Sequence, residues 1–116
     1  MAQSKLEQTR GDTRSYCFQR KDANGNVITD TPDSLYFTVK TSFNIRAFVL
    51  QKTLEDMTMD EDGTYHFTIE PEDTENLDYG AYAFDIQVTQ DGIVATIAKG
   101  RFILTEEATW ASNEGE

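Results

Sequence analysis

Apolar and polar residues alternate along most of the chain with a period of two, the pattern of half-buried β-strands. Leu35, Phe37 and Val39, for example, are separated by single residues, and the run 81–90 repeats the alternation. Successive side chains of a strand point to opposite faces of a sheet, so each run predicts one buried face and one solvent-facing face. Stripes with the period of a helix are nearly absent. The pattern therefore predicts an all-β fold.

Turn-forming residues separate these runs and set the number of strands. The pair Asn24-Gly25 favours positive φ, and Asp91-Gly92 predicts a tight hairpin between the last two runs. Around Pro71, a proline suited to a first helical position is followed by acidic residues, which predicts a short helical turn. About seven strands are expected, near residues 5–10, 13–20, 34–41, 46–53, 64–69, 81–90 and 93–104. Strands of this kind form a two-sheet sandwich.

The 116 residues suit one domain. We expect residues 1–105 to form the sandwich and residues 106–116 to form an acidic, polar C-terminal tail around Trp110. Cys17 is the single cysteine, so the fold depends on packing without an intramolecular disulfide. No apolar run approaches the roughly 18 residues of a membrane span, and residues 1–7 lack the apolar region of a secretory signal.

The charge is strongly acidic and unevenly placed. The formal net charge is −11, and residues 55–78 contain ten acidic residues and no basic one. Residues 1–54 contain eight basic and five acidic residues. Such a surface repels phosphate groups, so neither nucleic acids nor anionic membranes are expected partners. The acidic stretch serves either as a solubilising surface or as a patch that binds an unlike patch on a neighbouring copy.

The segment Asp78-Tyr79-Gly80-Ala81-Tyr82-Ala83-Phe84 resembles the tyrosine corner of immunoglobulin-type sandwiches. In that corner, a tyrosine near the start of strand F hydrogen-bonds to the backbone just upstream, two residues before a core cysteine. Tyr82 stands in the place of the tyrosine and Phe84 in the place of the cysteine, with Asp78 and Gly80 within the corner. The resemblance implies an immunoglobulin-like antiparallel β-sandwich, with the short helical turn preceding strand F.

The order of turns and aromatic strands over residues 6–105 resembles a more specific group. It is similar to the small immunoglobulin-like proteins and modules encoded among the virion genes of tailed phages and prophages, including the N-terminal modules of baseplate upper proteins. The segments that carry the likeness are Gly11-Asp12-Thr13, Asp22-Ala23-Asn24-Gly25-Asn26, Leu35-Tyr36-Phe37-Thr38-Val39-Lys40, Asp62-Gly63-Thr64-Tyr65-His66-Phe67-Thr68-Ile69, Pro71-Glu72-Asp73-Thr74 and Tyr79-Gly80-Ala81-Tyr82-Ala83-Phe84-Asp85-Ile86.

This second resemblance implies a non-enzymatic structural protein of the virion, placed in the head, neck, tail or baseplate. The expected partners are other virion proteins, including repeated copies of the chain in a symmetric homo-oligomer. The implied location is the virion, assembled in the cytoplasm of the bacterial host, and no cofactor is implied.

Aromatic residues at solvent-facing positions are candidates for contact with such partners, because tyrosine and tryptophan are enriched in interface hot spots. Tyr36 lies on the solvent-facing side of its strand, and Phe43 lies in the poorly patterned stretch 41–47. Trp110 either anchors a partner or folds back onto its own sandwich.

The acidic helical turn supplies the remaining interface candidates, Glu72, Asp73 and Glu75. We expect these carboxylates to meet a basic surface on another copy. The basic residues considered for that surface are Arg14, Arg20, Lys21, Lys40 and Arg46.

The sequence offers little that indicates catalysis or metal binding. His66 is the single histidine and is predicted, like Cys17, on a solvent-facing strand face, so nothing in the pattern brings the two within hydrogen-bonding reach. The acidic turns near Gly25 and Gly63 do not fit the calcium loop, whose twelfth position requires a glutamate. The alternative function is a receptor- or carbohydrate-binding adhesin module, which needs an exposed aromatic platform with polar neighbours.

Overall fold

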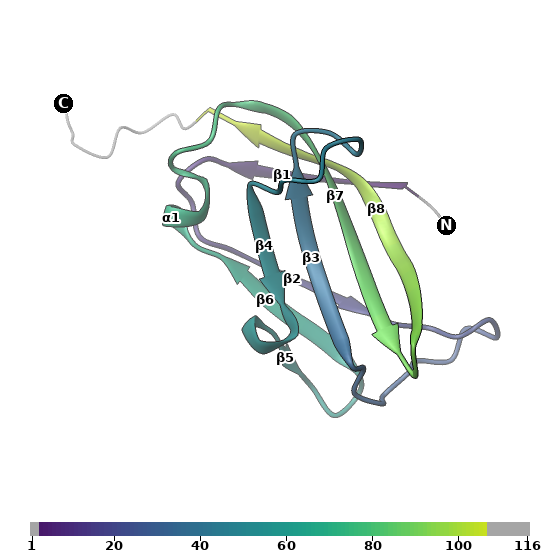
Figure 1. Cartoon of the computed structure of the whole chain (residues 1–116). Helices are drawn as coiled ribbons and strands as arrows, with labels where there is room; N and C mark the ends of the chain where they lie inside the picture. The colour runs from purple at the N-terminus through teal and green to yellow at the C-terminus, as the bar shows by residue number, and fades with distance from the viewer. Residues whose placement is uncertain (1–2, 107–116) are drawn as a thin grey trace.

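The structure, a computed structural model, describes residues 3–106 and contains two β-sheets packed as a sandwich (Figure 1). The larger sheet has the strand order β1-β8-β7-β3-β4, and the smaller sheet has the order β2-β6-β5. The elements are β1 (Gln3–Thr9), β2 (Arg14–Gln19), β3 (Ser34–Lys40), β4 (Leu50–Thr53), η1 (Leu54–Asp56), β5 (Thr58–Met59), β6 (Thr64–Ile69), α1 (Pro71–Thr74), β7 (Gly80–Gln90) and β8 (Ile93–Thr105).

The sheet topology matches that of an immunoglobulin sandwich, in which strands B, E and D share one sheet and strands C, F and G share the other. Here β2, β6 and β5 occupy the positions of B, E and D, while β3, β7 and β8 occupy those of C, F and G. The short helix α1 comes just before β7, as expected before strand F. The prediction of an all-β sandwich with a helical turn at this point is confirmed.

Three details of the sequence prediction are wrong. The two-residue strand β5 was missed because two residues are too short for an alternating pattern to show. Strand β4 begins at Leu50 rather than near residue 46, since residues 41–49 leave the sheet. The sandwich is not wholly antiparallel, because β1 pairs in parallel with β8. The parallel pairing brings Thr9 beside Thr105, and just beyond it Arg10 N donates to the Thr105 carbonyl at 3.0 Å.

Aromatic rings from both sheets meet in the core. The Phe37 ring of β3 lies 4.7 Å from the Phe67 ring of β6 and 5.7 Å from the Phe84 ring of β7, measured between centroids. Phe102 of β8 contributes a further ring at 6.4 Å from Phe37. All four side chains are buried, whereas Cys17 is exposed on the outer side of β2. The two sheets are therefore joined by aromatic packing, in the place where many immunoglobulin domains have a disulfide.

The corner before β7 has the hydrogen bond of a tyrosine corner. The Tyr82 hydroxyl donates to the carbonyl oxygen of Asp78 at 2.7 Å. Gly80, between them, has a φ of 136°, a conformation that a residue with a side chain rarely adopts. Phe84 follows on the buried face and is 3% exposed. The hydroxyl thus fixes the loop after α1 to the start of β7.

We expect Tyr82→Phe to lower the free energy of unfolding by about 1 kcal/mol, the usual net value of one intramolecular hydrogen bond. Urea unfolding followed by circular dichroism measures the change. Tyr79→Phe is the matched control, because the Tyr79 ring, with its centroid 4.3 Å from Arg10 Cζ, keeps this contact when the hydroxyl is removed. Equal stabilities of the two variants would contradict a stabilising role for the Tyr82 hydroxyl.

Candidate binding surface

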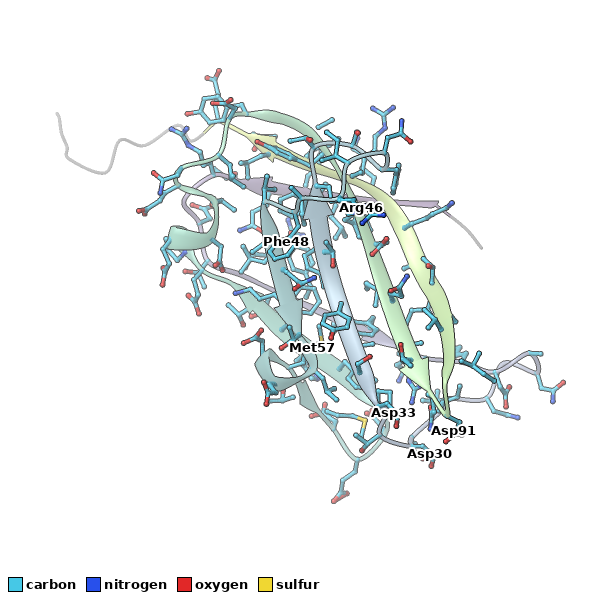
Figure 2. All side chains as sticks on the ribbon, viewed as in Figure 1. Asp30, Asp33, Arg46, Phe48, Met57 and Asp91 are labelled. Carbon is cyan, nitrogen blue, oxygen red and sulfur yellow. The ribbon has the colours of Figure 1, made fainter. Side chains whose placement is uncertain are left out.

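The outer face of the larger sheet, the side away from β2 and β6, is hollowed beneath the connection between β3 and β4. We call residues 41–49 the 41–49 loop. The first hollow, here called the Phe48 groove, has a volume of about 320 Å³. Its lining residues come from β3, β4, β7 and the loop: Tyr36, Thr38, Lys40, Arg46, Phe48, Gln51, Asp85 and Gln87. Figure 2 labels Arg46 and Phe48 at the same end of this sheet.

A second hollow, here called the Phe43 hollow, lies beside the same loop and has a volume of about 250 Å³. Its lining residues are Thr41, Ser42, Phe43, Ala81, Tyr82, Ala83 and Arg101. Phe43 also lines a third depression with Asp85, Thr96 and Lys99, and Asp85 in turn borders the Phe48 groove. The hollows therefore form one continuous surface, which we call the outer face.

Strand alternation and register explain why these side chains gather. Phe37 and Phe84 point into the core, so their neighbours along each strand point outward. The register pairs Thr38 of β3 with Asp85 of β7, and Asp85 with Lys99 of β8. Polar and charged side chains thus form a row across three strands. The 41–49 loop then adds its aromatic and basic side chains above the row.

The outer face concentrates positive charge in a strongly acidic chain. Lys40, Arg46, Lys99 and Arg101 line its hollows, and Asp85 is the acidic residue among the linings. The ion pairs found within the described residues 3–106 involve none of these four cations. Partial burial raises the pKa of Asp85 above its ordinary value, although Lys40 and Lys99 oppose the shift. The surface therefore favours anionic partners.

Aromatic side chains are exposed on the same surface. Tyr36 is 38% exposed, Phe43 52% and Phe48 53%. The Lys99 ammonium lies 5.9 Å from the centroid of the Phe43 ring, within the range of a cation–π contact. The structure thus brings Tyr36 and Phe43, the two aromatic interface candidates within residues 1–105, onto one face together with basic groups.

The three acidic candidates lie on or beside α1 but differ in their surroundings. Glu72 and Glu75 are exposed. The Asp73 carboxylate accepts a hydrogen bond from Lys52 Nζ at 2.8 Å and another from the backbone N of Glu70 at 2.8 Å. Asp73 is thus engaged within the chain, which leaves Glu72 and Glu75 as the candidates that face solvent.

The acidic and basic surfaces lie on different parts of the sandwich. The acidic stretch 55–78 includes part of η1, β5 and α1, which lie along the β4 side, on the left in Figure 1. Lys99 and Arg101 lie on β8, between β1 and β7 in the larger sheet. The acidic and basic groups are therefore carried by different elements of the sandwich.

One basic residue considered for a partner surface is buried. Arg20 is 4% exposed, and its guanidinium donates to the Gln90 side chain at 2.9 Å and to the Asp30 carbonyl. It is buried because the connection between β2 and β3 folds over it. Of the other candidates, Lys40 and Arg46 belong to the outer face. Trp110 lies outside the described residues.

Sequence reasoning missed the contributions of β7 and β8 to this surface, namely Asp85, Gln87, Lys99 and Arg101. The signal was present, because the Asp91-Gly92 hairpin fixes the register of the two strands and hence which residues share a face. What the sequence did not show is that the 41–49 loop covers that face.

The residues considered for catalysis lie on the other sheet. His66 Nε2 lies 2.8 Å from the Asp60 carboxylate, and Cys17 is the residue paired with His66 across β2 and β6. No hydrogen bond joins Cys17 to His66 in the described part of the chain, and no group of three potential metal ligands occurs there. The two residues form a cross-strand pair on the smaller sheet, away from the outer face.

No helix within residues 3–106 has both the length and the apolar character that crossing a membrane requires.

Comparison with known proteins identifies the fold but no family. No family model matches the sequence, and no curated protein matches it. Among solved structures, the chain is similar to part of an endo-β-1,4-mannanase from Thermotoga petrophila, with a TM-score of 0.58 and 13% sequence identity. The match covers 88% of this chain and 18% of the mannanase, so the chain spans less than a fifth of that protein. At this identity, the likeness concerns the fold alone.

Proposed function

We propose that this domain is a non-enzymatic structural module of a tailed-phage or prophage virion that binds neighbouring protein subunits in the head, neck, tail or baseplate. The virion setting rests on the likeness of the turn and strand motifs at residues 6–105 to virion modules. The binding role rests on one observation above all, the gathering of basic groups and exposed aromatic side chains on the outer face of an otherwise acidic domain.

The contact we propose joins unlike surfaces of two copies. The Phe48 groove of one copy, with Lys40 and Arg46, receives the exposed carboxylates Glu72 and Glu75 of the next copy. The two surfaces share no residue, so a contact in which each copy gives its groove to one neighbour and its carboxylates to another is heterologous, and repeated heterologous contacts close into rings or extend as filaments. Charge complementarity sets the orientation of each copy, while Tyr36 and Phe48 supply apolar contact area.

A charge-swap experiment tests this contact. We expect Lys40→Glu/Arg46→Glu and, separately, Glu72→Lys/Glu75→Lys to weaken assembly measured by native mass spectrometry. An equimolar mixture of the two variants should assemble again with the two variants alternating, because the unaltered groove of one meets the unaltered carboxylates of the other and the two reversed surfaces are again opposite in charge. Asp73 is left unchanged because it binds Lys52. Lys21→Glu, an exposed residue outside the outer face, is the matched charge control. Assembly unaffected by either double substitution would overturn the proposed contact.

A second candidate function is favoured by the make-up of the same groove. Tyr36 and Phe48 stand beside the amide side chains of Gln51 and Gln87, the combination of aromatic platform and polar groups that a carbohydrate-binding adhesin needs. Glycan-array binding by the full chain that is lost in Phe48→Ala would favour this function over subunit contact.

A further inference from the structure

Strand β2 has an open edge at a place where immunoglobulin sandwiches have a further strand. In those sandwiches the first strand, A, belongs to the same sheet as strand B and lies beside it. Here β1, the strand before β2, lies in the other sheet and pairs with β8 (Figure 1). Among residues 3–106, β2 therefore has β6 on one side and no strand on the other. We call this strand position beside β2 the β2 slot.

The free side of β2 presents backbone groups with which another strand can pair. An edge strand points the N–H and C=O groups of alternate residues away from its single neighbour. Within the described part of the chain, the backbone of β2 forms its backbone–backbone hydrogen bonds with β6. The remaining N–H and C=O groups of β2 therefore face the slot without a backbone partner.

The other edge strands are protected in ways that β2 is not. β5 has two residues and β4 has four. β1 carries charges at Lys5 and Glu7, and Arg14 Nη1 donates to the Glu7 carbonyl. Short length and charged side chains both discourage strand addition. In β2, by contrast, the residues from Ser15 to Gln19 are uncharged and include no proline.

An apolar hollow of about 170 Å³, here called the β2 hollow, lies between the two sheets at this edge. Leu6 of β1, Phe18 of β2 and Ala98 of β8 are among its lining residues. Cys17, which is exposed on the outer side of β2, also belongs to the lining, so the hollow reaches the edge of the strand. A cavity of about 150 Å³ with apolar walls accommodates benzene, so the β2 hollow has room for one large apolar side chain.

Two cations at the ends of β2 favour an acidic partner. Arg14 begins the strand and Lys21 follows its end, and both are exposed. Neither belongs to the ion pairs found within residues 3–106. Residues 3–21 contain five basic and two acidic residues, in a chain whose formal net charge is −11. A segment with carboxylates near its two ends would therefore gain favourable electrostatic interactions at both ends of the slot.

Strand β2 of a second copy does not meet these requirements. Its Tyr16 ring stacks on Phe67 of its own core, at 5.6 Å between centroids. Its Phe18 ring stacks on Tyr65 in the same way, at 5.1 Å. Neither ring is free to enter the hollow of another molecule, and β2 contains no acidic residue. These features favour a segment of a different protein as the occupant.

We propose that the β2 slot binds an extended segment of a partner protein by strand addition, a segment with apolar residues at alternate positions and acidic residues at its ends. Its backbone pairs with the free side of β2, and one apolar side chain enters the β2 hollow. Main-chain hydrogen bonds supply affinity in this mode, and alternate side chains supply specificity. The β2 hollow shares no residue with the Phe48 groove, so this contact and the proposed contact between copies can fail independently.

A synthetic peptide with this pattern tests the proposal on the full chain. The probe is acetyl-Glu-Val-Thr-Leu-Thr-Val-Thr-Glu-amide, whose glutamates are seven positions apart, as are Arg14 and Lys21. We expect the peptide to protect alternate amides of β2 from hydrogen exchange measured by NMR. A peptide of the same composition with its three apolar residues adjacent should bind several-fold more weakly. Equal binding of the two peptides, or no binding of the alternating peptide at about 1 mM, the weak limit of specific affinities, would overturn the proposal.

Substitutions in the hollow test the place of the apolar side chain. Ala98→Leu fills the hollow and should weaken binding several-fold, whereas Ala95→Leu, at an exposed position of the same strand, should not change it. Replacing the peptide leucine with alanine should weaken binding to the unaltered protein as well, so the test does not depend on the folding of Ala98→Leu. Unchanged affinity for the alanine peptide would show that no side chain enters the hollow and would overturn this contact.

The same measurements identify the edge and the occupant. Arg14→Glu/Lys21→Glu should weaken binding several-fold, because the glutamates of the peptide then meet like charges. Protection confined to amides of β1, β4 or β5 would place the peptide on another edge and overturn the proposal. Protection of β2 amides that increases with protein concentration in the absence of peptide would identify a second copy as the occupant and equally overturn it.

Discussion

Replacing Phe37 with alanine should lower the free energy of unfolding by about 3–5 kcal/mol, the range for loss of a buried phenylalanine. Phe37 is fully buried and contacts rings in both sheets, Phe67 on one side and Phe84 and Phe102 on the other. Truncation therefore removes buried apolar area and leaves a cavity at the point where the sheets meet. Domains of this kind have total stabilities of about 5–15 kcal/mol, so the variant would lose a large share of its stability.

Equilibrium unfolding in urea measures the loss, with a slope of about 1–3 kcal/mol per molar expected for a small domain. Phe48→Ala is the matched control, because Phe48 is 53% exposed in the Phe48 groove. A surface substitution of this kind changes stability by about 0.5 kcal/mol or less. A loss below about 1 kcal/mol for Phe37→Ala, well under the range for a buried phenylalanine, would show that aromatic packing at Phe37 does not hold the sheets together.

The inner faces of the sheets were predictable from the sequence for a simple reason. A shift of one residue in a strand exchanges its buried and exposed sides, so the alternation at Leu35, Phe37 and Val39 allows only one orientation. The same logic placed Cys17 outward. The corner at Tyr82 was also readable, because residues 78–84 resemble the tyrosine corner of immunoglobulin-type sandwiches, and the structure shows its hydrogen bond from Tyr82 to the Asp78 carbonyl.

The outer face was only partly predictable, because it depends on contacts between residues distant in sequence. Tyr36 and Phe43 were singled out as exposed aromatic residues, but their grouping with Lys99 and Arg101 requires the order of β3, β7 and β8 within the sheet. The prediction for Arg20 was wrong for the same reason, because its burial depends on a segment that folds back over it. Its basic side chain indicated a surface position, yet the segment between β2 and β3 folds over it and supplies the Asp30 carbonyl as a partner.

The connection between β2 and β3 also explains why a side chain at position 63 should lower the stability of the domain. Gly63 lies in the turn between β5 and β6 with a φ of 90°, a left-handed conformation that costs other residues about 1–2 kcal/mol. A Cβ atom at this position would lie 2.7 Å from Val27 Cγ1 and 3.2 Å from the Ile28 carbonyl oxygen. Ile28 cannot easily move away, because its backbone N donates to the Arg20 carbonyl at 2.8 Å.

Gly63→Ala is therefore expected to lower the free energy of unfolding by about 2–4 kcal/mol, the sum of the conformational cost and the cost of overpacking. Gly92→Ala separates the two contributions, since Gly92 has a φ of 81° and a Cβ atom there would have no atom of residues 3–106 outside the turn within 4 Å. It should lose only the conformational part, about 1–2 kcal/mol. Urea unfolding of both variants gives the difference. Equal losses would mean that residues 27–29 do not pack against the β5–β6 turn, and that the cover over Arg20 is looser than its hydrogen bonds indicate.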